Sequence, residues 1–104
     1  MDIERLDTMA FDGYGSHGLT MTEVEPGPGI RVHVARFLPG GVLGRHRAGL
    51  QQRFTVIAGT GWVSCDGRRV EISVGDSVVW QVGQEHESGS DLGMTVLILQ
   101  RMST

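Results

Sequence analysis

From residue 30 onward, apolar and polar residues alternate in short runs, and glycine-rich or Asp-Gly segments separate the runs. A period of two places neighbouring side chains on opposite faces of an extended chain, as in β-strands. The pattern predicts strands at residues 30–38, 52–58, 61–65, 68–73, 76–82 and 94–99. Short strands at this spacing are typical of an all-β sandwich or barrel.

Two turn signals and the N-terminal segment complete this outline. The Pro-Gly-Gly segment at 39–41 predicts a turn after the first strand, and the Asp-Gly pair at 66–67 predicts a hairpin with a type I′ turn. Residues 2–12 have a weakly helical apolar pattern and are expected to form a short helix or an arm. We therefore divide the chain into an N-terminal arm or loop at residues 1–25 and a β-domain at residues 26–104.

Composition and charge favour a globular protein of the cytoplasm. A chain of 104 residues with 39% hydrophobic and 20% charged residues is ordinary for one domain with its own core. The net charge is −3 and the densest basic segment is Arg68-Arg69, which argues against nucleic acids and anionic membranes as partners. Cys65 is the single cysteine, the first residues are charged, and no apolar stretch reaches the ~20 residues of a membrane span. These features predict a reducing, cytoplasmic location.

Two histidines stand in glycine frames of defined spacing. In the first frame, His46 follows Gly40 after five residues, and Gly59 closes the frame. The second frame runs from Gly75 to His86, and fifteen residues separate the two frames.

This arrangement resembles the two sequence motifs of the cupins, and the resemblance extends over residues 30 to 100. The family's first motif has His-x-His followed by Glu, and here Ala48 and Gln52 occupy the positions of the second histidine and the glutamate. Its second motif has Pro and Asn at the positions of Gln81 and Ser90. The resemblance implies a small cupin, an all-β jelly-roll barrel of antiparallel strands with a pocket inside one end.

In the cupins, the histidines and the glutamate of the two motifs bind a divalent metal. Carried over to this chain, the resemblance implies a tentative ligand set of His46, Gln52 and His86. A Gln amide oxygen is a weaker ligand than a carboxylate, and burying an uncompensated charge costs on the order of several kcal/mol per ion. Glu85 would compensate that charge if its side chain pointed inward. We therefore expect either no cofactor or a weakly bound divalent ion, namely iron, manganese, nickel or zinc.

Some cupins are metal-free isomerases, epimerases or cyclases that use a histidine in the barrel, and the same residues fit that chemistry. A free imidazole has a pKa near ~6.5 and exchanges protons at cellular pH. His86 would act as the general acid or base, and His46 would orient it or bind the substrate. Gln52 would form a hydrogen bond with a carbonyl or hydroxyl group of the ligand.

The parity of the chain around the first motif suggests which side chains line the pocket. Residues 46 to 52 place every second side chain on one face if the chain there is extended, and the same parity continues into the next strand. Trp80 lies six residues before His86 and is expected near the pocket. We expect ligand contacts from Gln52, Phe54, Val56, Trp80 and Glu85. A mostly apolar pocket with a few polar groups suits a small organic molecule.

Three functions are open from the sequence. The first is binding of a small organic molecule with metal-independent acid–base catalysis by histidine. The second is a metal-dependent oxygenase, lyase or isomerase, and the third is a non-catalytic ligand-binding or sensor module. The substituted ligand positions favour the first over the second, and nothing in the chain separates the first from the third. The edge strands of so short a barrel also predict a homodimer, to which residues 1–25 would contribute.

Overall fold

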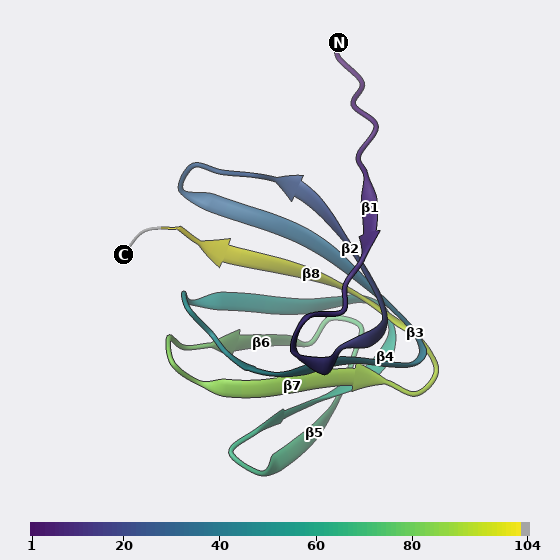
Figure 1. The fold of residues 1–104 in the computed structure, drawn as a ribbon, viewed down its shortest axis with the longest axis vertical. Coiled ribbons are helices and arrows are strands. Elements are labelled where there is room, and N and C mark those ends of the chain that lie inside the picture. Colours follow the sequence, from purple (N-terminus) through teal and green to yellow (C-terminus); the bar gives the residue numbers. More distant parts are fainter. Residues whose placement is uncertain (103–104) are drawn as a thin grey trace.

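A computed structural model describes residues 1–102, which form antiparallel β-strands joined by short turns (Figure 1). The strands are β1 (Thr8–Ala10), β2 (His17–Glu25), β3 (Ile30–Arg47), β4 (Gln52–Cys65), β5 (Arg68–Ser73), β6 (Ser77–Trp80), β7 (Glu85–Ser90) and β8 (Met94–Arg101). A single 3-10 turn, η1 (Gly13–Gly15), is the one helical element of this range. No helix within residues 1–102 is long and apolar enough to cross a membrane. The predicted all-β class is confirmed.

The two long strands β3 and β4 close the barrel. The first part of β3 pairs with β8 and its last part pairs with β7. The first part of β4 also pairs with β8, and its last part pairs with β7. The four strands therefore form a closed ring of backbone hydrogen bonds, which is the antiparallel jelly-roll barrel that the resemblance to the cupins implied. Among the described strands, β1 and β5 lie at the ends of the order β1-β2-β3-β7-β4-β5, and β6 pairs with β4 outside this order.

Two predicted interruptions are bends inside continuous strands. The Pro-Gly-Gly segment at 39–41 is not a turn, because β3 runs through it and changes partner from β8 to β7 there. The predicted strands 52–58 and 61–65 are likewise the two halves of β4. Gly59 joins these halves with a φ of +76°, and a Cβ at this position would meet the carbonyl oxygen of Gly93. Glycine thus allows a sharp bend without ending the strand.

The predicted hairpin at Asp66-Gly67 is confirmed. It joins β4 to β5, and both residues have positive φ, 53° at Asp66 and 75° at Gly67. Two positive values in a two-residue loop are the type I′ geometry, whose twist matches that of the flanking strands.

The N-terminal segment is extended rather than helical. Residues 1–7 precede β1 and project away from the barrel, as Figure 1 shows. β2 pairs with β3 along its whole length, so residues 17–25 belong to the sheet and the division expected after residue 25 falls at the hairpin between β2 and β3. The apolar residues that suggested a helix, Ile3 and Leu6 among them, are exposed.

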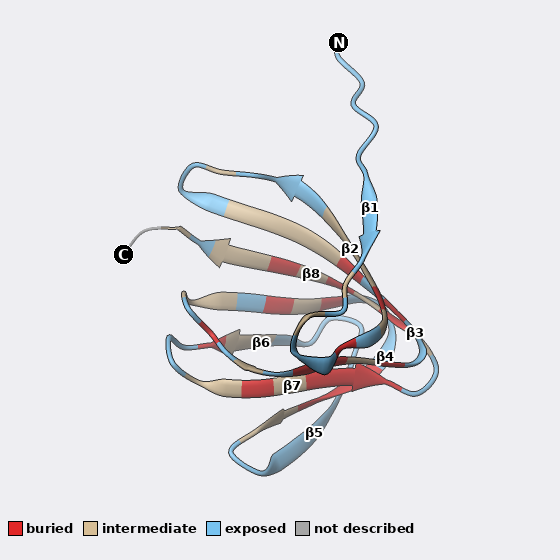
Figure 2. Cartoon of the chain, in the orientation of Figure 1, coloured by how far each residue is buried: buried red, intermediate tan, exposed pale blue. Residues whose placement is uncertain are grey.

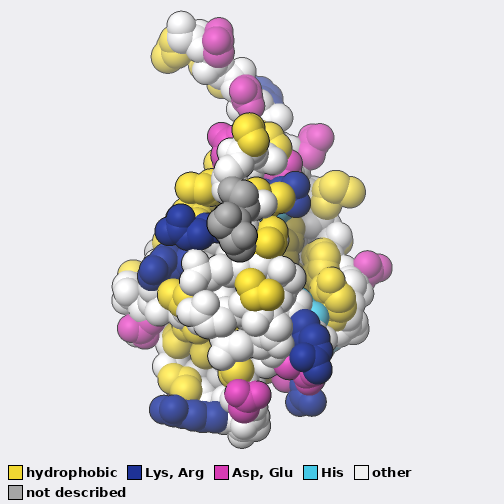
Figure 3. Space-filling model, turned by 90° about the vertical axis from the view of Figure 1, so that its left-hand side faces the viewer, with side chains coloured by type: hydrophobic (Ala, Val, Ile, Leu, Met, Phe, Trp, Pro, Cys, Tyr) yellow, Lys and Arg dark blue, Asp and Glu magenta, His cyan; other side chains and the backbone are white. Residues whose placement is uncertain are grey.

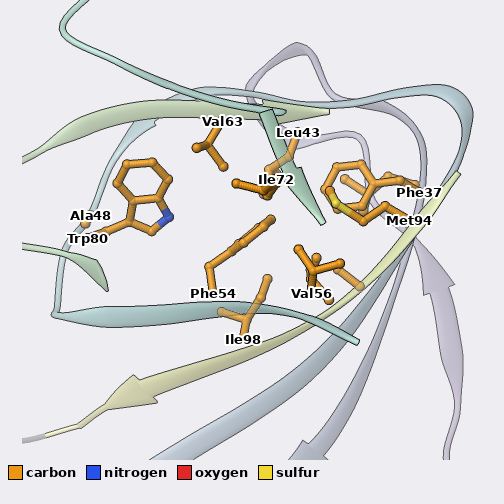
Figure 4. Packing of buried hydrophobic residues seen from close by; sticks show 13 residues of the cluster. Phe37, Leu43, Ala48, Phe54, Val56, Val63, Ile72, Trp80, Met94 and Ile98 are labelled. Carbon is orange, nitrogen blue, oxygen red and sulfur yellow. The ribbon is translucent and has the colours of Figure 1, made fainter. Parts of the chain in front are cut away.

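The interior of the barrel is packed with apolar side chains. Buried positions concentrate on β7, on both sides of the exposed bend of β4 and in the first part of β8, whereas the N-terminal segment is exposed (Figure 2). Phe54 and Val56 point inward from β4, as their parity predicted, and are almost fully buried. The cluster also contains Leu43, Ile72 and Trp80, which surround Phe54 (Figure 4). Because these side chains fill the middle of the barrel, the space for a ligand lies at its mouth.

Candidate functional site

The two motif histidines lie side by side at one end of the barrel. His46 on β3 and His86 on β7 are register partners in adjacent antiparallel strands. Their ring centroids are 4.3 Å apart, and the ring planes are inclined by 58°. The structure therefore brings together two residues that are forty positions apart in the sequence.

The histidine pair is held between two further aromatic rings. Tyr14 stacks on His46 with a centroid distance of 4.6 Å and an interplanar angle of 10°. On the other side, Trp80 stacks on His86 at 4.3 Å and 13°. The stacked contacts at the two ends and the tilted contact between the imidazoles restrict the orientation of both histidine rings. Sequence reasoning placed Trp80 near the site and missed Tyr14, whose one signal was that it is the single tyrosine, between two glycines.

The η1 turn is anchored against β3 so that Tyr14 reaches His46. The backbone N–H of Gly44 donates a hydrogen bond of 2.9 Å to the buried Oγ of Ser16. A Cβ on Gly44 would meet the carbonyl oxygen of Tyr14, so only glycine allows this approach. Tyr14 itself has a φ of 57°, in the left-handed region that a non-glycine residue rarely adopts. A strained residue held by such contacts is typical of a functional site.

The hydrogen bonds of the two imidazoles define their tautomers. Nδ1 of His46 lies 2.8 Å from the carbonyl oxygen of Gly44, and Nδ1 of His86 lies 3.1 Å from the carbonyl oxygen of Gln84. A carbonyl oxygen can only accept, so each Nδ1 carries the proton. In the neutral ring, each Nε2 then has a free lone pair that can accept a proton.

Burial favours the neutral form of His86. Only 3% of its surface is exposed, and this desolvation lowers its pKa from the ordinary value of 6.5. A positive charge on His46 lowers the pKa of His86 further, while the hydrogen bond to the Gln84 carbonyl opposes both effects in part. The pair therefore disfavours the state in which both imidazoles are charged.

A cavity of about 410 Å³ opens at the barrel mouth beside His46. It is lined by Phe11, Tyr14, Met21, Arg31, His33, Leu43, His46, Arg47, Gly49, Gln52, Ile98 and Gln100. The extended face expected for residues 46 to 52 is not observed, because β3 ends at Arg47 and residues 48–51 turn into β4. His46 and Gln52 nevertheless reach the same cavity from two different strands.

His86 and Glu85 face a second hollow. This hollow of about 610 Å³ is lined by His86 together with surface residues that include Arg45, Arg47 and Glu85. The carboxylate of Glu85 lies 3.6 Å from Arg45 and 3.8 Å from Arg47, with 42% of its side chain exposed. Its negative charge is therefore directed to surface arginines rather than to the histidine pair.

The donor groups at the histidine pair do not fit a resident divalent metal. They are two imidazoles and the neutral amide of Gln52, and Ala48 is a buried side chain without a donor. Within residues 1–102, no cluster of three or more His, Cys, Asp or Glu side chains is arranged to bind a metal ion. A catalytic metal usually needs three protein ligands, and a dication buried without a carboxylate has no anionic partner.

Comparisons with known proteins agree with this fold. The polyketide cyclase RemF from Streptomyces resistomycificus superposes with a TM-score of 0.85 at 14% identity, over 99% of this chain and 80% of that one. KdgF from Halomonas sp. gives 0.82 at 20% identity over 94% and 89%, and a cupin-2 domain from Rhodospirillum rubrum gives 0.83 at 15% over 98% and 75%. These identities indicate a shared fold and no more. No curated protein matches the chain in sequence. Residues 33–96, more than half of the chain, match the cupin domain family, and the protein therefore belongs to the cupins.

Proposed function

We propose that this cupin binds a small organic molecule in the cavity at the barrel mouth and exchanges a proton with it through histidine, without a resident metal. The observation that carries the proposal is the histidine pair itself. Both imidazoles donate from Nδ1 to backbone carbonyls, and both keep Nε2 free as a proton acceptor. The flanking rings of Tyr14 and Trp80 fix their orientation in advance.

The geometry favours a division of roles opposite to the one expected from the sequence. His46 lines the ligand cavity, so its Nε2 is the group that meets the ligand. His86 packs behind His46 and does not line that cavity. We therefore assign proton transfer to His46, and we assign to His86 the positioning of His46 and the control of its charge.

The proposed proton transfer involves only the ligand and His46, and the proton is returned to the ligand. Nε2 of His46 takes a proton from a C–H or O–H group of the ligand and returns it to another atom of the same ligand. The Nδ1–H group stays bonded to the Gly44 carbonyl, which also stabilises the imidazolium. Neutral, buried His86 adds no second positive charge nearby. The net result is an isomerisation or a cyclisation, which consumes no co-substrate.

The walls of the cavity suit an organic ligand. Phe11, Leu43 and Ile98 supply apolar surface, and Gln52 supplies an amide for a carbonyl or hydroxyl group. The volume is in the range of known small-molecule sites. Phe54, Val56 and Trp80, which the sequence suggested as ligand contacts, belong to the packed core and do not line this cavity. RemF, a polyketide cyclase, has the same barrel fold, which is compatible with a cyclisation in this barrel.

Deuterium exchange tests the proposal without knowledge of the natural substrate. The purified protein, treated with a chelator and checked for metal by elemental analysis, is incubated in D2O with a panel of small cyclic and aryl ketones. NMR then measures deuterium incorporation at the carbon next to the carbonyl. We expect exchange above background with the wild type, loss of this exchange in His46→Ala, and no change in His17→Ala, in which an exposed histidine outside the cavity is removed.

Three results would overturn the proposal. Exchange that depends on an added divalent metal would restore the metal-dependent alternative. Binding of ketones without any exchange would support the third function, a non-catalytic ligand-binding module. Exchange in His46→Ala at the wild-type rate would exclude His46 as the proton acceptor.

A further inference from the structure

The cavity at the barrel mouth is lined by basic side chains, unlike the protein as a whole. The chain as a whole is acidic, with a net charge of −3, and basic and acidic side chains are interspersed on its outer surface (Figure 3). The cavity is lined by two arginines and two histidines and by no carboxylate. A concave surface with one sign of charge attracts ligands of the opposite sign.

Arg31 is the arginine of the cavity whose charge is not paired with any residue that the structure describes. His33 lies 3.4 Å from Glu23, and Arg47 lies 3.8 Å from Glu85. Arg31 forms no ion pair within residues 1–102, and its Nε is buried there without a hydrogen-bond partner. A buried donor without a partner costs free energy, so it needs an explanation such as a ligand that is bound in function.

Strand pairing places two amides next to Arg31. Arg31 on β3 and Gln52 on β4 are both register partners of Gln100 on β8, one from each side. All three side chains are half-buried and line the same cavity. They form a row of N–H donors across three adjacent strands, in which the guanidinium can bind a carboxylate through two parallel hydrogen bonds.

We propose that the ligand of this cavity is a small organic carboxylate with an apolar body. The guanidinium of Arg31 holds the carboxylate, and the amides of Gln52 and Gln100 supply further donors. The apolar body lies against the wall that includes Leu43 and Ile98, within reach of His46. This inference rests on the proposed function for the identity of the ligand site, and it adds the chemical class of the ligand.

Pairs of ligands that differ only in charge test the inference. The probes are benzoate with benzamide, phenylacetate with phenylacetamide, and hexanoate with hexanamide. Dissociation constants come from NMR titrations that follow the histidine ring signals of the protein. We expect the wild type to bind the carboxylate of at least one pair about tenfold or more tightly than its amide, as a charge-assisted pair requires.

Three variants connect this preference to Arg31. Arg31→Gln removes the charge and should bind acid and amide equally, whereas Arg31→Lys keeps the charge without the planar fork and should retain part of the preference. Arg36→Gln is the matched control, because Arg36 is an exposed arginine on the same strand that does not line the cavity. It should leave the preference unchanged. Thermal unfolding of each variant shows that it is folded.

The outcomes separate this inference from the proposed function. Equal binding of acid and amide by the wild type, or an unchanged preference in Arg31→Gln, would overturn the carboxylate inference and leave proton transfer by His46 untouched. Failure of every pair to bind would also overturn the inference. A clear preference for carboxylates together with no ketone exchange would support the inference and overturn the proposed catalysis.

Discussion

The burial of His86 makes the stability of the protein depend on pH. Desolvation lowers its pKa in the folded protein from 6.5, and in the unfolded chain the pKa returns to about that value. Between the lower folded pKa and the unfolded pKa, the unfolded state binds a proton that the folded state does not. The stabilisation from neutral His86 is therefore complete above about pH 6.5 and decreases as the pH falls toward the folded pKa.

We expect the free energy of unfolding of the wild type to fall between about pH 7.5 and about pH 5.5, and to fall less in His86→Gln, which does not ionise. Urea denaturation at both pH values measures the difference. His17→Gln, in which an exposed histidine is replaced, is the control and should keep the wild-type dependence. The same pH dependence in the wild type and in His86→Gln would contradict the buried neutral state of His86.

At the scale of elements, the strands that the sequence predicted are those whose apolar residues alternate. β5, β6 and β8 were predicted close to their observed bounds, and β3 and β4 were predicted in part. β7 was missed because its sequence, EHESGS, contains no apolar residue. It is nevertheless the most buried of the described strands, since β3 and β4 flank it on both sides and the ring of Trp62 packs against Gly89. Periodicity cannot identify a strand that is buried by its neighbours rather than by its own side chains.

β7 also contains two buried serines that differ in their hydrogen bonds. Ser88 and Ser90 point to the same face and each has 1% of its surface exposed. The Oγ of Ser90 donates to the Thr60 carbonyl at 2.6 Å and accepts from the N–H of Gly93 at 2.8 Å, so it fixes the turn between β7 and β8. The Oγ of Ser88 is buried without a partner within residues 1–102. The first hydroxyl should stabilise the fold, and the second should not.

We expect Ser90→Ala to lower the free energy of unfolding by about 1–3 kcal/mol, because it leaves the Gly93 N–H without its acceptor. Ser88→Ala should change it by less than about 1 kcal/mol or raise it, since it removes a buried polar group without a partner. Urea denaturation of both variants measures the two effects, and each variant is the control for the other. Equal losses would show that the hydroxyl of Ser88 is hydrogen-bonded in solution.

At the scale of the whole molecule, the site is assembled from segments that are distant in the sequence. The motif spacing predicted His46, His86 and Gln52, because glycine frames keep these positions recognisable. It did not predict Arg31 or Gln100, which reach the cavity only because β3 and β4 both pair with β8. Residues that are brought together by the pairing of distant strands share no recognisable spacing in the sequence. They can be identified only once the strand pairing is known.

The ends of the strand order give the homodimer prediction a definite location. Within residues 1–102, β1 pairs with β2 and with no other strand, so its outer edge could accept a strand of another chain. The segment before it extends away from the barrel, with Ile3 78% exposed, and Met9 within β1 is 69% exposed. A second copy of this chain placed against β1 would cover both the edge and these apolar side chains.

We expect the protein to sediment as a dimer, and Ile3→Glu combined with Met9→Glu to shift it to the monomer, because charges at an apolar contact resist burial. Val74→Glu, at an exposed apolar position between β5 and β6, is the control and should leave the dimer intact. A monomeric wild type would contradict the prediction. A dimer that survives the substitutions in the arm but dissociates with Val70→Glu on β5 would move the contact to the opposite edge, because β5 is the other strand at an end of the order.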